Sequence, residues 1–263
     1  MIRFDMGGLT GREGAAYDAR MAGSKARARP RKGRRRGQRS RPGRLLLRGL
    51  VRGLLMAAVL VVALVALFGQ VNPPPGLYMM AERQRHGTLE RDWVPMAQIS
   101  PHMARSAVAA EDANFCLHWG FDMGEIRRAI DAGGTRGAST ISQQTVKNVF
   151  LWHGRSWPRK ALEAVLTPIM EATWSKRRIL EVYLNVAEFD TAVFGVEAAA
   201  RHYFGTSAAR LTPMQAARLA AILPDPKGRS AARPSPFVQR RAQAILDGAA
   251  TIARDGRAAC FED

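Results

Sequence analysis

One long apolar run dominates the first third of the chain. Residues 53–69 read GLLMAAVLVVALVALFG and contain no charged side chain. Extended back past Arg52 to Gly49, the run reaches about 20 residues, the length that a helix needs to cross a hydrocarbon core of roughly 30 Å. We therefore predict a transmembrane anchor over residues 45–70. A cleaved signal peptide is the alternative, but the run is longer than a usual signal core and no A-x-A pair lies near its end.

Beyond residue 100, apolar positions recur at helical spacing, and strand-like alternation is nearly absent. Leu162, Val165 and Ile169 lie three or four residues apart, which places them on one face of a helix. Pro168 should bend that helix, because proline removes a backbone hydrogen bond. Residues 77–99 have room for a short strand. Capping residues or a proline in the first turn mark helix starts at Ser100-Pro101, Thr140, Pro158 and Thr212-Pro213. The pattern predicts a mainly α fold.

The basic residues gather before the apolar run. The chain holds 40 Lys and Arg against 22 Asp and Glu, a net charge of +18, and residues 1–70 hold 16 of the former against 3 of the latter. Residues 1–44 lack periodicity and are broken by Gly, Pro and Ser, so we predict a disordered segment. Basic flanks stay cytoplasmic, which predicts an external domain over residues 71–263. An RNA-binding arm is the alternative, but the adjoining span favours a membrane protein without a nucleic-acid partner.

Cys116 and Cys260 are the two cysteines of the chain. Two cysteines exclude a disulfide-built scaffold and a cysteine-rich zinc module. A single disulfide between them is compatible with the sequence, but we favour two reduced thiols. The histidines are not spaced as metal ligands, so we expect no metal site.

Four polar segments are candidates for chemistry, although the last of them, residues 176–185, on its own looks like an amphipathic helix with a solvated basic face. Glu111 ends a predicted helix, where the helix dipole disfavours a carboxylate; a solvated acidic pair or a functional group would explain it. Residues 137–148 read as a capped helix start, and Lys147 nearby would turn that start into an anion site. Arg159 and Glu163 are four residues apart and form at least a surface ion pair.

Taken in order, four segments resemble the successive signature motifs of the family 51 glycosyltransferases. They are residues 111–122, 137–148, 159–163 and 176–185. With two later segments, 193–205 and 211–224, the resemblance covers about residues 77–250. No S-x-x-K sequence occurs, which favours the single-domain form of these peptidoglycan-polymerising enzymes over the form with a transpeptidase domain.

The resemblance implies a lysozyme-like, two-lobed helical glycosyltransferase domain at the outer face of a bacterial inner membrane. Such an enzyme polymerises lipid II. The 4-hydroxyl of an incoming sugar attacks the anomeric carbon of the growing strand, and polyprenyl pyrophosphate leaves with inversion. The implied partners are lipid II, the glycan strand, the bilayer and other cell-wall synthesis proteins. No cofactor is expected to be required, and stimulation by a divalent cation stays open.

The same resemblance assigns roles to seven residues. Two are acidic and catalytic, the base Glu111 and the second acid Glu163. Four fall on positions near the leaving pyrophosphate: Ser139, Lys147, Arg155 and Arg159. Gln143 is a further substrate contact. The chain departs from the family at Ala138, Gln215 and residues 190–194, and at Cys116, where an aromatic or other bulky residue is usual.

Two other classes of protein fit part of these observations. A lytic enzyme with a lysozyme-like fold would also carry a catalytic glutamate, but it would not need a basic cluster for a pyrophosphate. A non-catalytic membrane scaffold would not need to keep Glu111, Lys147 and Glu163 together. We therefore favour the polymerase.

Overall fold

The computed structural model describes residues 42–133, 137–154 and 156–262. Of the segment predicted to be disordered, residues 1–41 lie outside this part of the chain, and residues 42–44 form the first turn of helix α1. Contacts divide the chain into two units between Arg48 and Gly49. The contacts discussed below all lie within the second unit, Gly49–Asp263.

Helix α1 (Pro42–Phe68) contains the predicted span. Its segment Leu46–Phe68 is long and apolar enough to cross a membrane, with a mean hydropathy of 2.7 in the most apolar stretch. Only 6% of that stretch is buried inside the structure, so α1 is not a core helix of the folded domain. Apolar side chains exposed along a whole helix are what a lipid environment requires.

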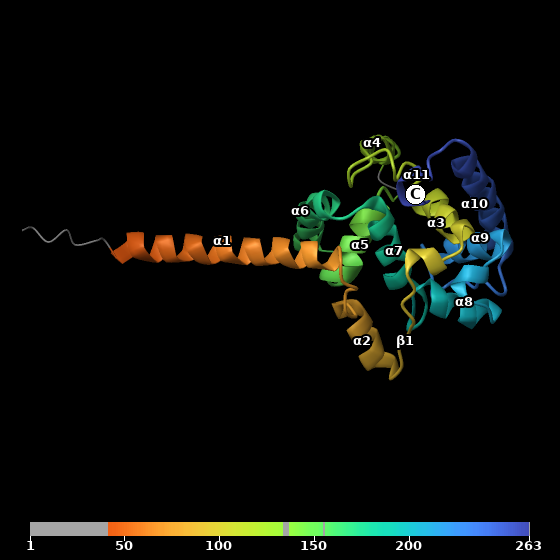
Figure 1. Cartoon of the computed structure of the whole chain (residues 1–263), viewed down its shortest axis with the longest axis horizontal. Helices are drawn as coiled ribbons and strands as arrows, with labels where there is room; N and C mark the ends of the chain where they lie inside the picture. Colours follow the sequence, from red (N-terminus) through yellow and green to blue (C-terminus); the bar gives the residue numbers. More distant parts are fainter. Residues whose placement is uncertain (1–41, 134–136, 155, 263) are drawn as a thin grey trace, which may run out of the picture. The chain divides into compact units, whose positions relative to one another are not determined.

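Two groups of helices form the body of the domain (Figure 1). In one, α3 (Pro101–Glu111), α9 (Pro213–Ile222) and α10 (Pro236–Arg254) pack against one another; in the other, α5 (Ile141–Phe150) packs against α6 (Trp157–Thr173) and α7 (Lys176–Val186). Their apolar faces are buried, and each fully buried large side chain stabilises the fold by about 1.5–3 kcal/mol. The predicted mainly α fold is confirmed.

Local signals fix where these helices begin. Thr140 Oγ1 accepts a hydrogen bond from the backbone N–H of Gln143 (3.2 Å), and Gln143 Oε1 accepts one from the backbone N–H of Thr140 (3.1 Å). This capping box starts α5 as predicted, and a second one starts α9. Ser100 precedes α3, but its hydroxyl donates to the carbonyl of Leu211 (3.1 Å) instead of capping the helix.

Smaller elements complete the domain. A three-stranded sheet has the order β1-β3-β2, with β1 (Glu90–Arg91) parallel to β3 (Val193–Phe194) and β2 (Glu188–Asp190) antiparallel to it. The remaining helices are α2 (Leu77–His86), α4 (Met123–Asp131), α8 (Val196–Phe204), α11 (Ala259–Glu262) and the 3-10 turns Met96–Gln98 and Ala208–Arg210. The short strand expected within residues 77–99 is present as β1, whereas α2 was not predicted. Helix α6 continues through Pro168, and a bend there stays a prediction.

The end of α1 is attached to the helices that carry the site described below. The indole N–H of Trp174 donates to the carbonyl of Val65 (2.7 Å). The guanidinium of Arg178 on α7 donates to the carbonyl of Phe68 (3.1 Å), which satisfies a free carbonyl at the C-terminus of α1, and to that of Val71 (2.9 Å) in the segment that follows. The ring of Phe68 stacks on Phe150 at the end of α5. The last turn of α1 is therefore fixed to the domain.

The prediction of two reduced thiols is wrong. Cys116 and Cys260 form a disulfide between residues 144 positions apart, with their Cα atoms 5.7 Å from each other. Cysteine count alone could not show this proximity, which arises only when α11 folds back onto the loop after α3. A link that closes so long a loop constrains the unfolded chain and typically adds about 2–4 kcal/mol of stability.

We expect Gly120→Ala to lower the free energy of unfolding more than Gly205→Ala. Both glycines have positive φ, +87° and +61°, where a side chain costs about 1–2 kcal/mol. At Gly120 an added Cβ would also lie 2.6 Å from Thr167 Cγ2, whereas at Gly205 it would meet nothing within 4 Å. Overpacking should therefore add about 1–3 kcal/mol at Gly120 alone. Urea unfolding of both variants checks this, and equal losses would contradict the packing described.

Candidate active site

A cleft of about 730 Å³ lies between the two helix groups. Six of the seven predicted site residues line it: Glu111, Ser139, Gln143, Lys147, Arg159 and Glu163. They come from the end of α3, from α5 and the segment before it, and from α6. The structure thus brings together side chains spread over more than 50 positions. Arg155, the seventh, lies outside the described residues.

Glu111 is the last residue of α3 and is mostly buried, with 12% of its side chain exposed. Its Oε2 accepts a hydrogen bond from Gln144 Nε2 on α5 (3.1 Å). Its Oε1 is buried and accepts no hydrogen bond from any residue in the described part of the chain. One carboxylate oxygen is therefore held in place, and the other is left as a free acceptor.

Arg241 on α10 offsets the unfavourable placement of the Glu111 carboxylate at the C-terminus of α3. Its Nη2 lies 3.7 Å from Glu111 Oε1 and donates a weak hydrogen bond to the carbonyl of Ala110 (3.4 Å). A cation at a helix C-terminus is favourable, and it offsets the unfavourable position of the carboxylate. Sequence analysis missed Arg241, because it is 130 positions away from Glu111 on another helix and no local pattern links the two.

The pKa of Glu111 is raised above its ordinary value of 4.5, chiefly because burial disfavours the charged form. The hydrogen bond from Gln144 and the charges of Arg241 and Lys147 oppose this shift in the pKa, while the charge of Asp112 adds to it. The pKa of Tyr183 on α7 is also raised, chiefly by burial and then by the charges of Glu111 and Asp112. A carboxylate with a raised pKa is a stronger base near neutral pH.

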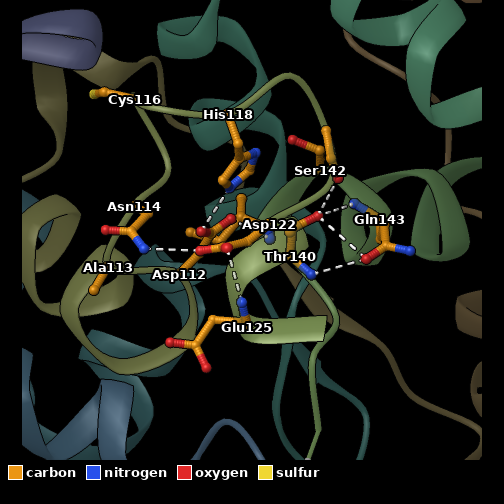
Figure 2. Close-up of polar contacts among 12 residues, drawn as sticks. Asp112, Ala113, Asn114, Cys116, His118, Asp122, Glu125, Thr140, Ser142 and Gln143 are labelled. Carbon is orange, nitrogen blue, oxygen red and sulfur yellow. Dashed lines mark hydrogen bonds and ion pairs between the residues drawn. The ribbon is translucent and has the colours of Figure 1, made fainter. Parts of the chain in front are cut away.

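Asp112 joins the end of α3 to the start of α5 (Figure 2). Its Oδ2 accepts the backbone N–H of Ile141, the first residue of α5 (3.0 Å), and its Oδ1 lies 2.8 Å from His118 Nε2. Both side chains are almost completely buried. A charged acceptor at a helix N-terminus is favourable. The link places Glu111, the residue before Asp112, beside Gln144, one turn into α5.

The rest of the loop after α3 is also held by polar contacts. Asn114 Nδ2 donates to Asp122 Oδ2 (2.8 Å), and Asp122 Oδ1 caps α4 by accepting the backbone N–H of Glu125 (2.9 Å). The hydroxyl of Thr140 donates to the carbonyl of Gly120 (2.7 Å). The polar residues Asp112, Asn114 and Asp122 of the first motif therefore hold the loop after α3 in position, and they do not line the cleft.

Glu163 is fully engaged by cations. Its Oε2 accepts from Arg159 Nη1 (2.8 Å), its Oε1 pairs with the ammonium of Lys160, and only 3% of the residue is exposed. The predicted ion pair with Arg159 is confirmed. Lys160, which sequence analysis missed although it lies within the third motif, also approaches Ser139 Oγ (3.5 Å). Glu163 is therefore placed to orient two cations, not to transfer a proton.

Of the cations that line the cleft in the described part of the chain, Lys147 is the one without a fixed partner. No hydrogen bond joins its Nζ to another residue within residues 42–133, 137–154 and 156–262. Burial lowers its pKa, while the charges of Glu163 and Glu111 act in the opposite direction. A half-buried ammonium without a partner favours an anionic ligand.

The cleft carries an excess of positive charge. Its lining includes four cationic side chains, Lys147, Arg159, Lys160 and Arg241, against the two carboxylates of Glu111 and Glu163. The amide oxygen of Gln143 is used in the capping box, which leaves its NH₂ group for the cleft. Among the described residues, no three His, Cys, Asp or Glu side chains gather as a metal site. The arrangement suits a ligand with two or more negative charges.

Comparison with known proteins agrees with this geometry. Residues 79–250 match the protein family described as Transglycosylase, whose domain is lysozyme-like. The biosynthetic peptidoglycan transglycosylase of Jannaschia sp. (strain CCS1) is 62% identical over 218 residues, which cover 83% of this chain and 90% of that protein. Proteins of the same name from Rhodospirillum centenum and Caulobacter vibrioides are 48% and 45% identical, over 83% and 82% of this chain and 96% and 97% of theirs. The chain is therefore a glycosyl-transferring enzyme that belongs to the transglycosylase family.

Proposed function

We propose that this enzyme polymerises lipid II into peptidoglycan glycan strands. One observation carries the proposal: Glu111, with a free buried oxygen, shares a single cleft with a cluster of cations around Glu163. A proton acceptor next to an anion site is what transfer from a pyrophosphate-linked sugar requires. The relatives named biosynthetic peptidoglycan transglycosylase support peptidoglycan as the product.

In the proposed reaction, Oε1 of Glu111 accepts the proton of the sugar 4-hydroxyl. The oxygen forms a bond to the anomeric carbon of the growing strand, while the bond from that carbon to pyrophosphate breaks and its electron pair goes to the phosphate oxygen. Attack opposite the leaving group inverts the anomeric centre, as in inverting glycosidases, with a sugar hydroxyl in place of water. A positioned base of this kind contributes about 10²–10⁴-fold to the rate.

The pyrophosphate would lie against Lys147, Arg159 and Lys160, with Ser139 as a hydrogen-bond donor. Its charge grows as the bond breaks, so these cations stabilise the transition state more than the bound substrate. Glu163 orients Arg159 and Lys160. Arg155 and the NH₂ group of Gln143 are proposed as further contacts with the substrate. The chemistry needs no cofactor.

The membrane span fits a substrate that cannot leave the bilayer. Each buried CH₂ of a polyprenyl chain contributes roughly 0.8 kcal/mol to its membrane affinity, so the enzyme has to work at the membrane surface. We propose that the basic N-terminal segment is cytoplasmic and that the domain lies on the outer face of the inner membrane. Attachment of the end of α1 to α5 and α7 keeps the cleft close to that surface.

Glu111→Gln should abolish polymerisation, because an amide cannot accept the proton, and it should leave the melting temperature near that of the wild type. Lipid II polymerisation by purified protein measures the effect. Glu125→Gln, which changes an exposed carboxylate on α4, is the matched control and should keep full activity. Near-normal glycan synthesis by Glu111→Gln would remove Glu111 as the base.

Gln144→Leu should move the acid limb of the profile of kcat/KM against pH to higher pH. The hydrogen bond from Gln144 lowers the pKa of Glu111, so its loss raises that pKa further, and the base is protonated earlier as the pH falls. The profile is measured for wild type and variant in the same detergent. A limb that stays in place or moves to lower pH would show that Glu111 does not set it.

Lys147→Ala should reduce kcat about 10²–10³-fold, the usual effect of removing one group that stabilises transition-state charge. Lys147→Arg retains the positive charge and should recover part of that loss. Steady-state polymerisation rates, with melting temperatures for both variants, test this. If Lys147→Ala changed only stability, the pyrophosphate role of Lys147 would be wrong.

A further inference from the structure

The loop that carries Asp112 is held from outside by the C-terminal end of the chain. We call residues 255–262 the C-terminal strap. The disulfide between Cys116 and Cys260 joins loop and strap covalently. Arg257 Nη1 donates to the carbonyl of Ala113 (3.1 Å), next to Asp112. Each residue of the loop between 112 and 118 is thus within a few sequence positions of a residue that contacts the strap.

The strap is itself anchored to both helix groups. Arg105 on α3 forms a two-pronged ion pair with Glu262, at 2.6 and 2.8 Å. Arg177 at the start of α7 donates to the carbonyls of Phe261 (2.8 Å) and Glu262 (3.2 Å). The ring of Phe261 is fully buried and lies near the ring of Phe115 in the loop, with 6.4 Å between their centroids. The strap is therefore a rigid support on which the loop rests.

The link between loop and strap is covalent, and the contact between the rings of Phe115 and Phe261 adds to it. Neither cysteine lines the cleft, so the bond has no direct part in the chemistry.

We propose that the disulfide-linked C-terminal strap is a positioning element for Glu111. It holds the loop in the register in which Asp112 receives the N–H of Ile141, and it thereby keeps the end of α3 against the start of α5. The inference rests on the proposed role of Glu111 as base. The disulfide acts on Glu111 indirectly. It positions Asp112, and Asp112 in turn maintains the contact between Glu111 and Gln144.

The proposal predicts specific changes when the bond is lost. The distance between Glu111 and Gln144 would fluctuate, and a misplacement of about 1 Å can cost on the order of 10²-fold in rate. Water would reach the carboxylate and weaken the burial that raises the pKa of Glu111. The hydrogen bond from Gln144, which lowers that pKa, would weaken too, but burial is the larger of the two influences. Arg241 and Lys147, whose charges lower this pKa, would stay in place, whereas Asp112, whose charge raises it, would be held less firmly. The acid limb of kcat/KM would therefore move to lower pH.

The test uses the full chain with both cysteines replaced, Cys116→Ala together with Cys260→Ala, well below its melting temperature. We expect kcat with lipid II to fall at least about 10-fold, the acid limb to move to lower pH, and the Ile141 amide to exchange hydrogen faster. Leu211→Ala, a buried site away from the cleft, is the control that lowers stability. It should leave kcat, the acid limb and Ile141 exchange unchanged.

If the folded double variant kept the kcat, the acid limb and the Ile141 exchange rate of the wild type, the proposal would be wrong. The disulfide would then only stabilise the fold. If the double variant does not fold, folded wild type treated with a phosphine reductant, which converts the disulfide to two thiols, supplies the same comparison. Glu111→Gln in the same assay separates the two proposals. An active Glu111→Gln refutes the base, whereas an inactive Glu111→Gln beside a normal double variant refutes only the strap.

Discussion

The carboxylate of Asp112 is the constraint on which the rest of the site depends. It binds the first N–H of α5 and contacts His118, and so it joins two helices that belong to different packed groups. The backbone between them consists of a loop, the short helix α4 and a second segment before α5, so helix packing alone does not fix their ends. Because Glu111 precedes Asp112, the same contact sets the position of the proposed base beside Gln144.

Burial and charge divide the cleft into two parts with different properties. Around Glu111, burial raises the pKa and leaves one oxygen without a hydrogen-bond donor, which suits proton transfer. Around Glu163, the carboxylate is paired with Arg159 and Lys160, which fixes two cations where charge would develop. Lys147 is affected by both parts of the cleft. Burial lowers its pKa, and the charges of Glu163 and Glu111 raise it. Preorganised charge of this kind needs no rearrangement during the reaction.

Much of this could be predicted from local sequence. The capping box of Thr140 and Gln143, the helical spacing around Glu163 and the ion pair with Arg159 all depend on residues three or four positions apart. Arg241 and the disulfide depend on contacts across more than 100 positions, which no local pattern encodes. Pairing of Cys116 with Cys260 was mispredicted for that reason. Gln144 and Lys160 lay inside recognised motifs, but only the geometry shows which carboxylate each one contacts.

In the proposed mechanism Glu111 is a buried base whose raised pKa governs turnover. A ¹³C NMR titration of the glutamate carboxyl groups, with Glu111 assigned by its loss in the Glu111→Gln variant, measures that pKa directly in the free enzyme. We expect a pKa above the ordinary value of 4.5 that coincides with the acid limb of kcat/KM for lipid II polymerisation. A Glu111 that titrates at or below 4.5, or apart from that limb, would contradict it.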